Sequence, residues 1–153
     1  MRPAEKLFNE LEAKANAGRV RVIEADVRIA AEVADFDRLG LAIHRLEIEG
    51  ASLPGRLGRL AEEIPMKLTY LLEPLALIER EEGEPFLLIR SVPPHRQEAS
   101  IDYYEIRLSG GGPLSLERYG YQRSQRIRER TPMLFTREVF GRLLDDLVGL
   151  MAA

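Results

Sequence analysis

The residues with the clearest chemical potential lie between positions 118 and 130, where arginine and tyrosine stand among small and polar side chains. This segment has five arginines against one glutamate, and its two tyrosines lie near its start. Arginine pairs with phosphate or carboxylate in a two-pronged geometry, and tyrosine can stack on a base or a ring. The segment would therefore suit RNA or another anionic ligand. The simpler interpretation is the exposed face of an edge strand, where charge discourages aggregation between sheets.

The sequence predicts two sets of contact residues. The candidate binding residues join the arginines of this segment with the tyrosines of two neighbouring predicted strands, two of them on each side of the sheet: Tyr103, Tyr104, Arg118, Tyr119, Tyr121, Arg123, Arg126, Arg128 and Arg130. On a sheet face left open within one chain, such residues would form a surface typical of protein interfaces. Phe140 and Leu144 are the candidate lining of a ligand pocket between the last helix and the sheet.

Patterns for catalysis and metal binding are weak. The two histidines, His44 and His95, lie in different segments without a second histidine at ligand spacing, which argues against a zinc site. His95 could act as a general base with Glu98 or Asp102, although a solvated loop is the simpler interpretation. The glycines at 110–112 indicate a hairpin turn, because no predicted helix follows them that could hold a phosphate. We therefore expect no catalytic residue, no metal site and no cofactor, and we favour a protein that is not an enzyme.

Composition and charge exclude several classes of protein. The sequence has 153 residues, of which 45% are hydrophobic and 31% charged, as in an ordinary soluble globular protein of one domain over residues 1–153. A net charge of −3 argues against a general nucleic-acid binder, because phosphate neutralisation supplies most non-specific affinity. The absence of cysteine excludes disulfides and thiol catalysis. Charged residues interrupt the start of the chain, where a signal peptide would be apolar, so we expect a cytoplasmic protein without a membrane partner.

The last fifth of the chain predicts a helix that begins at Thr136. Its apolar residues recur at intervals of three and four and therefore share one face, whereas charged residues take the opposite face. The apolar stripe consists of Val139, Phe140, Leu143, Leu144, Leu147, Val148 and Met151. Such a helix lies against a hydrophobic surface, which the preceding strands must supply.

Two further helices are predicted earlier in the chain. Residues 3–16 place apolar side chains on one face and end near Gly18, a suitable C-terminal cap. Ser52 can cap a second amphipathic helix over residues 53–64, which Pro65 would stop.

Alternation of apolar and polar residues predicts the strands. The first pair forms a hairpin of residues 23–34, with a bulge near residue 22, and residues 39–48, with a bulge near His44. A helix over residues 27–39 is the alternative for the first of them. Later strand-like runs are separated by glycine and proline and cover residues 66–79, 86–92, 100–108 and 113–122, with a short final strand at 123–130. The result is a two-layer α+β fold, with a mostly antiparallel sheet of about six strands and the C-terminal helix on one of its faces.

Three functional hypotheses follow from this architecture. The helix–strand–strand beginning is similar to secretion chaperones, and a C-terminal helix gripped by an antiparallel sheet is similar to helix-grip ligand-binding domains; both likenesses concern architecture and not motifs. The leading hypothesis is a non-enzymatic protein-interaction or chaperone-like module, a homodimer that presents a sheet face or edge to a partner. The alternatives are a carrier or enzyme for a small ligand held beneath the last helix, and RNA binding through residues 118–130.

Overall fold

The computed structural model describes residues 1–50 and 53–152, so the N-cap predicted at Ser52 falls outside the described residues. The helices are α1 (Pro3–Lys14), α2 (Leu57–Lys67) and α3 (Arg137–Met151), and a short 3-10 helix, η1 (Leu53–Arg56), directly precedes α2. The strands are β1 (Gly18–Glu24), β2 (Val27–Phe36), β3 (Gly40–Glu49), β4 (Leu75–Glu81), β5 (Phe86–Ser91), β6 (His95–Arg96), β7 (Ser100–Ser109), β8 (Leu114–Gln122), β9 (Ile127–Thr131) and β10 (Met133–Thr136).

All ten strands of the described residues belong to one antiparallel sheet with the order β1-β2-β3-β8-β7-β5-β4. The other strands attach to this path: β10 pairs with β3, β6 with β7 and β9 with β8. An α+β fold with an antiparallel sheet is thereby confirmed, but the expected number of about six strands is wrong. Part of the difference lies in β6 and β10, which have two and four residues and are too short to show a clear period, whereas β9 overlaps the short final strand expected at 123–130.

The first predicted strand, over residues 23–34, is in fact two strands joined by a tight turn. β1 and β2 pair with each other up to a turn made of Ala25 and Asp26. Ala25 has a φ of 54°, in the left-handed region that alanine adopts less readily than glycine or asparagine. Asp26 is the one usual turn residue here, no glycine or asparagine accompanies it, and the apolar alternation runs through the turn without a break. The alternative of a helix over residues 27–39 is also wrong.

Of two further predictions, the bulge near His44 is confirmed and the strand over residues 66–79 is wrong in part. The bulge expected near His44 is confirmed, because Glu32 pairs with Arg45 and Val33 with Ile43, which leaves His44 unpaired in the ladder. The strand expected over residues 66–79 is wrong over its first part.

In that part of the chain, α2 continues through Pro65 to Lys67, and β4 begins only at Leu75. Pro65 lies in the last turn of α2, where the hydrogen bond that proline removes is one of the last in the helix. Likewise, α1 ends at Lys14 with Ala15 in the left-handed conformation as its C-cap, whereas Gly18 already belongs to β1.

The C-terminal helix agrees with the prediction. The hydroxyl oxygen of Thr136 accepts a hydrogen bond from the backbone N–H of Val139 at 3.2 Å, as an N-cap residue should. Five residues of the predicted apolar stripe are buried, namely Phe140, Leu143, Leu144, Leu147 and Met151, and the other two, Val139 and Val148, are partly buried. The strand before the helix, β10, lies so close to β3 that a side chain on Gly40 would collide with the carbonyl of Phe135.

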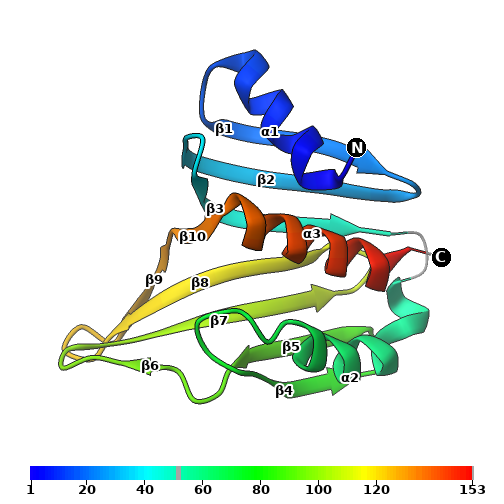
Figure 1. Ribbon diagram of the computed structural model, residues 1–153. Coiled ribbons are helices and arrows are strands. Elements are labelled where there is room, and N and C mark those ends of the chain that lie inside the picture. Colours follow the sequence, from blue (N-terminus) through cyan, green and yellow to red (C-terminus); the bar gives the residue numbers. More distant parts are fainter. Residues whose placement is uncertain (51–52, 153) are drawn as a thin grey trace.

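The helices lie on the same side of the sheet (Figure 1). α3 contacts β3 and β10, and it is flanked by α1 and α2, which both contact it. The buried apolar side chains of these helices and of the facing sheet residues form one continuous cluster. Within residues 1–50 and 53–152, no helix is long and apolar enough to cross a bilayer.

We call the other side of the sheet the open face, because no helix of the described residues lies on it (Figure 1). Strand pairing places the following residues on this face: Arg19, Arg21, Ile23, Arg28, Ala30, Glu32, Arg45, Glu47, Glu49, Leu88, Arg90, Tyr103, Glu105, Arg107, Ser115, Glu117, Tyr119 and Tyr121. Most of them are charged or aromatic. The open face therefore holds most of the candidate binding residues.

Candidate binding surface on the open sheet face

Charged side chains form a row across the middle of the open face. The row crosses six strands in the order Arg19, Glu32, Arg45, Glu117, Glu105 and Arg90. Arg130, on β9, bridges Glu32 at 3.1 Å and Glu117 at 3.0 Å. Opposite charges on neighbouring strands stabilise a sheet, so the row stabilises strand pairing at each step except the one from Glu117 to Glu105, where two like charges are neighbours.

Two acidic residues in this row are buried beneath arginines. Glu117 is contacted by Arg45 at 2.9 Å, and Glu105 by Arg90 at 3.0 Å and by Arg128 at 3.3 Å. Burial acts against the charged form of Arg128, but its hydrogen bond to Tyr103 and the charge of Glu105 outweigh this and raise the pKa of the guanidinium. The carboxylates and arginines at the centre of the face therefore satisfy one another.

The structure brings together five of the predicted binding residues on this face: Tyr103, Tyr119, Tyr121, Arg128 and Arg130. The rings of Tyr103 and Tyr119 are 6.0 Å apart, and the Arg128 guanidinium lies 3.9 Å from the centre of the Tyr119 ring. Three of the four predicted tyrosines thus face the same side, not two on each side. Burial, together with the charge of Glu117, raises the pKa of Tyr119.

Tyr104 and Arg118 lie on the other side of the sheet and are buried. Arg118 donates two hydrogen bonds to the carboxylate of Glu73, at 2.8 and 2.9 Å, and its guanidinium lies 4.4 Å from the centre of the Tyr104 ring. The Ser91 hydroxyl donates to Glu73 at 2.8 Å and accepts from the Tyr104 N–H at 2.7 Å. Although burial opposes it, pairing with Glu73 raises the pKa of Arg118. This closed group is part of the core and leaves Arg118 no exposed charge for a partner.

The remaining predicted residues are spread over other places. Arg123 and Arg126 are exposed in the turn between β8 and β9, where Arg126 has a φ of 53°. Phe140 and Leu144 are fully buried, and the Phe140 ring lies 6.1 Å from that of Phe8 and 5.9 Å from that of Phe135. The pockets described below are lined by other residues.

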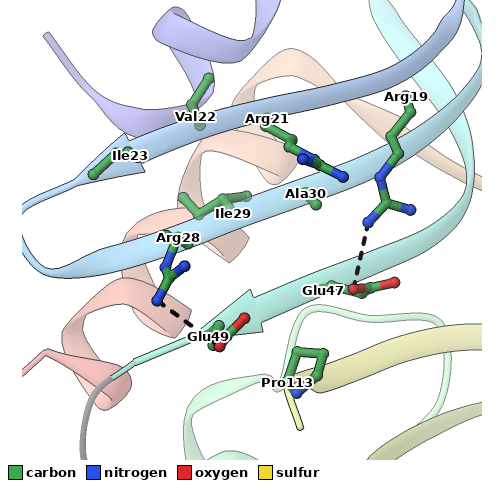
Figure 2. A pocket seen from close by; sticks show the side chains of 10 residues that line it. All are labelled: Arg19, Arg21, Val22, Ile23, Arg28, Ile29, Ala30, Glu47, Glu49 and Pro113. Carbon is green, nitrogen blue, oxygen red and sulfur yellow. Dashed lines mark ion pairs between the residues drawn. The ribbon is translucent and has the colours of Figure 1, made fainter.

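A pocket of about 320 Å³ opens at one corner of the open face, where β1, β2 and β3 meet the β7–β8 loop. We call it the corner pocket (Figure 2). It is lined by Arg19, Arg21, Val22, Ile23, Arg28, Ile29, Ala30, Glu47, Glu49 and Pro113. Three arginines stand against two glutamates in this lining, so the corner pocket carries a net positive charge.

The arginines of the corner pocket are held more loosely than those at the centre of the face. Arg28 lies 4.0 Å from Glu49, and Arg19 lies 3.7 Å from Glu47, both at the outer limit of an ion pair (Figure 2). In the part of the chain that the structure describes, Arg21 makes no ion pair and no side-chain hydrogen bond. These cations are therefore available to an anionic group, which their central counterparts are not.

Sequence analysis missed these arginines, although one local signal exists. Arg19 and Arg21 alternate with Val20 and Val22, and this period of two places both cations on the same face of β1. Arg28 could not be joined to them from sequence, because its position opposite Ile23 depends on the unrecognised turn between β1 and β2.

A second hollow, of about 390 Å³, is lined by residues of β2, β3, the loop between them and β10, with Asp35 and Asp37 among its apolar residues. Leu39 and Leu134 both line it and are 71% and 76% exposed. Phe36, also in the lining, is partly buried. We call these three residues the apolar patch.

No catalytic arrangement forms around the histidines. His95 lies opposite Asp102 in the β6–β7 pair, but Asp102 accepts its side-chain hydrogen bond from Gln97 at 3.0 Å. Among the described residues, no group of three or more histidines and acidic residues converges as metal ligands would.

Comparison of the chain with protein-family models, with curated proteins and with solved structures finds no match.

Proposed function

We propose that the protein is a non-enzymatic, chaperone-like interaction module that binds another protein at the corner of its open sheet face. In this proposal, the helices form one layer and the sheet the second, so that one sheet face is left for a partner. The observation that carries it is the contrast between the centre and the corner of the face. Glu105 and Glu117 are satisfied by close arginines, whereas Arg21 in the corner pocket lacks a partner among the described residues.

An apolar residue beside these cations supports a protein partner. Ile23 lines the corner pocket and is 63% exposed. Protein interfaces combine such apolar contacts with arginine, which is enriched in them. A site for a small inorganic anion would not need Ile23 at its rim.

The proposal includes self-association through the apolar patch. Leu39 and Leu134 line the same hollow and are both exposed, and a second copy would remove both side chains from water. The homodimer is thus assigned to a surface different from the corner pocket.

The two alternatives stay predictions with less support. Ligand binding beneath α3 would need space next to Phe140 and Leu144, which are fully buried. RNA binding through residues 118–130 would rest on Arg123 and Arg126 in the β8–β9 turn, because Arg118, Arg128 and Arg130 are paired with glutamates.

Site-specific photocrosslinking in cells tests the proposed function. A photoreactive amino acid at Ile23, 63% exposed, is compared with one at Met66, which is 75% exposed on α2. The expected result is a discrete covalent adduct with another protein from position 23 and none from position 66. Equal yields from both positions, or no adduct from either, would contradict the proposal.

A further inference from the structure

We infer that the free edge of β1 binds an extended acidic segment of the partner protein as an added strand centred on Arg21. This inference rests on the proposed function and deepens it, because it names the chemistry of the partner. The observations behind it are the edge of β1 that pairs with no described strand, the cations along it, and the corner pocket at its side.

β1 ends the sheet, and among the described strands it pairs with β2 alone. The carbonyl oxygens of Arg19 and Ile23 accept hydrogen bonds from the side chains of Lys14 and Lys6, both at 3.1 Å. These carbonyls therefore point away from β2. In an antiparallel strand the outward groups recur at every second residue, so the N–H and C=O of Arg21 also point to the free edge.

The two lysines restrict which strand can be added. They occupy the outward carbonyls on either side of Arg21, and lysine at an edge is a common protection against unspecific strand pairing. The N–H and C=O of Arg21 are the pair of groups that a partner can take without displacing a lysine. On either side of Arg21, an acidic strand would bind more tightly than a neutral one, because its carboxylates can form ion pairs with the ammonium groups of the two lysines.

The side chains of β1 specify a pattern in the partner. Arg19, Arg21 and Ile23 lie on the open face, and residues directly opposite them in an antiparallel partner would be about 5 Å away on that face. The partner runs in the opposite direction, so the matching order is apolar, any residue, acidic, any residue, acidic. Arg28, which is opposite Ile23 on β2, adds a further cation at the corner pocket, level with the apolar position of the partner.

Charge also argues against pairing of β1 with β1 of a second copy. In an antiparallel pair centred on Arg21, the Arg21 side chains of the two copies would face each other, and like charges directly opposite destabilise a sheet. The sequence of the other terminal strand, β4, has the required spacing at Leu77, Glu79 and Glu81, although a bulge between Leu77 and Glu79 interrupts the alternation there. A second copy that used β4 is therefore the rival occupant, and the experiment must separate it from a partner protein.

Titration of the purified full-length chain with a short capped peptide tests the inference. In the peptide, one leucine and two glutamates follow the pattern with threonine between them, and a control peptide has glutamine in place of glutamate. We expect the acidic peptide to bind at least about tenfold more tightly than the control, since each lost charged hydrogen bond costs about 1.5 kcal/mol. Binding should weaken with added salt.

Two variants locate the binding site. Arg21→Gln should weaken binding of the acidic peptide about tenfold, whereas Arg126→Gln, which changes an arginine in the β8–β9 turn, should leave it unchanged. Both side chains are exposed, so both variants should fold. Strand addition also predicts slower hydrogen exchange of the Arg21 amide in the complex, which a merely electrostatic contact would not produce.

The outcomes separate the possibilities. Equal binding of the acidic and the glutamine peptide, an unchanged affinity of Arg21→Gln, or an unprotected Arg21 amide would overturn the inference. Self-association of the chain that Arg21→Gln and Glu79→Gln each abolish would show a second copy at the edge and would also overturn it. An adduct from Ile23 in cells without binding of the acidic peptide would leave the proposed function standing and refute only the acidic strand.

Discussion

Glu105 and Glu117 face each other directly across the β7–β8 ladder, and both are almost completely buried. Two like charges in this position would drive the strands apart if nothing compensated them. Arg45 and Arg90 reach the pair from β3 and β5, and Arg128 reaches it from β9. The open face is thus polar but closed at its centre, which is why its corner is the better place for a partner.

Loss of a single arginine from this centre should be measurable. Arg128→Met removes an ion pair with Glu105 and a cation over the Tyr119 ring, so we expect a loss of about 1 kcal/mol in the free energy of unfolding. The effect is modest because the Arg128 side chain is 37% exposed. Urea denaturation of the variant measures it, with Arg123→Met in the neighbouring turn as the control. Equal stability of both variants would contradict the compensating role of Arg128.

The buried pair of Glu73 and Arg118 should matter more. Arg118→Met leaves the Glu73 carboxylate without its buried counter-charge, which costs about 3 kcal/mol in comparable cases. The double variant with Glu73→Met should lose clearly less than the sum of the two single variants, because no unpaired charge remains. Urea denaturation of the four proteins of this cycle gives the coupling energy. Additive losses would mean that the two side chains are energetically independent.

Local periodicity explains why parts of the fold could be predicted from sequence. The helix after Thr136 has a cap and an apolar stripe within a few turns, and both are properties of neighbouring residues. The turn at Ala25 and Asp26 has no glycine, asparagine or proline to mark it, so the sequence predicted one strand where the structure has two.

The candidate site depends on relationships that no local pattern contains. The density of arginine pointed to residues 118–130, but Arg118 is 45 residues away from Glu73, which neutralises it. Conversely, the structure brings no acid to the Arg21 side chain within the described residues and places this arginine in the corner pocket. Charge along the sequence indicates where cations are, and only the pairing of strands indicates which of them are free.

Alkaline pH should destabilise the protein through Tyr70. Burial, and the hydrogen bond that its hydroxyl donates to Asp146 at 2.7 Å, raise the pKa of Tyr70 above the ordinary value of 10.0. The folded state therefore keeps a proton that the unfolded state loses above pH 10, so this contribution to stability is complete below pH 10 and falls as the pH rises further. Urea denaturation between pH 8 and pH 11 should show a decline that is shallower in Tyr70→Phe.

Tyr70→Phe should also cost about 1 kcal/mol at neutral pH, because Asp146 loses the hydrogen bond. Tyr121→Phe serves as the control, since the Tyr121 hydroxyl makes no hydrogen bond within the described residues. The same alkaline slope in the wild type and in Tyr70→Phe would exclude Tyr70 as its source.

Self-association should depend on the apolar patch. Leu134 and Leu72 are both 76% exposed. Leu134 belongs to β10 and lines the same hollow as Leu39, whereas Leu72 lies in the segment between α2 and β4. A glutamate at position 134 would be desolvated in a dimer formed through the patch, and an unpaired buried charge costs several kcal/mol. Sedimentation equilibrium over a range of concentrations should therefore show a wild-type dimer, an unchanged dimer of Leu72→Glu and a monomer of Leu134→Glu. A wild-type monomer at the highest concentration, or a dimer that survives Leu134→Glu, would show that the apolar patch is not the dimer interface. The proposed binding at the corner pocket would still stand, because it uses other residues.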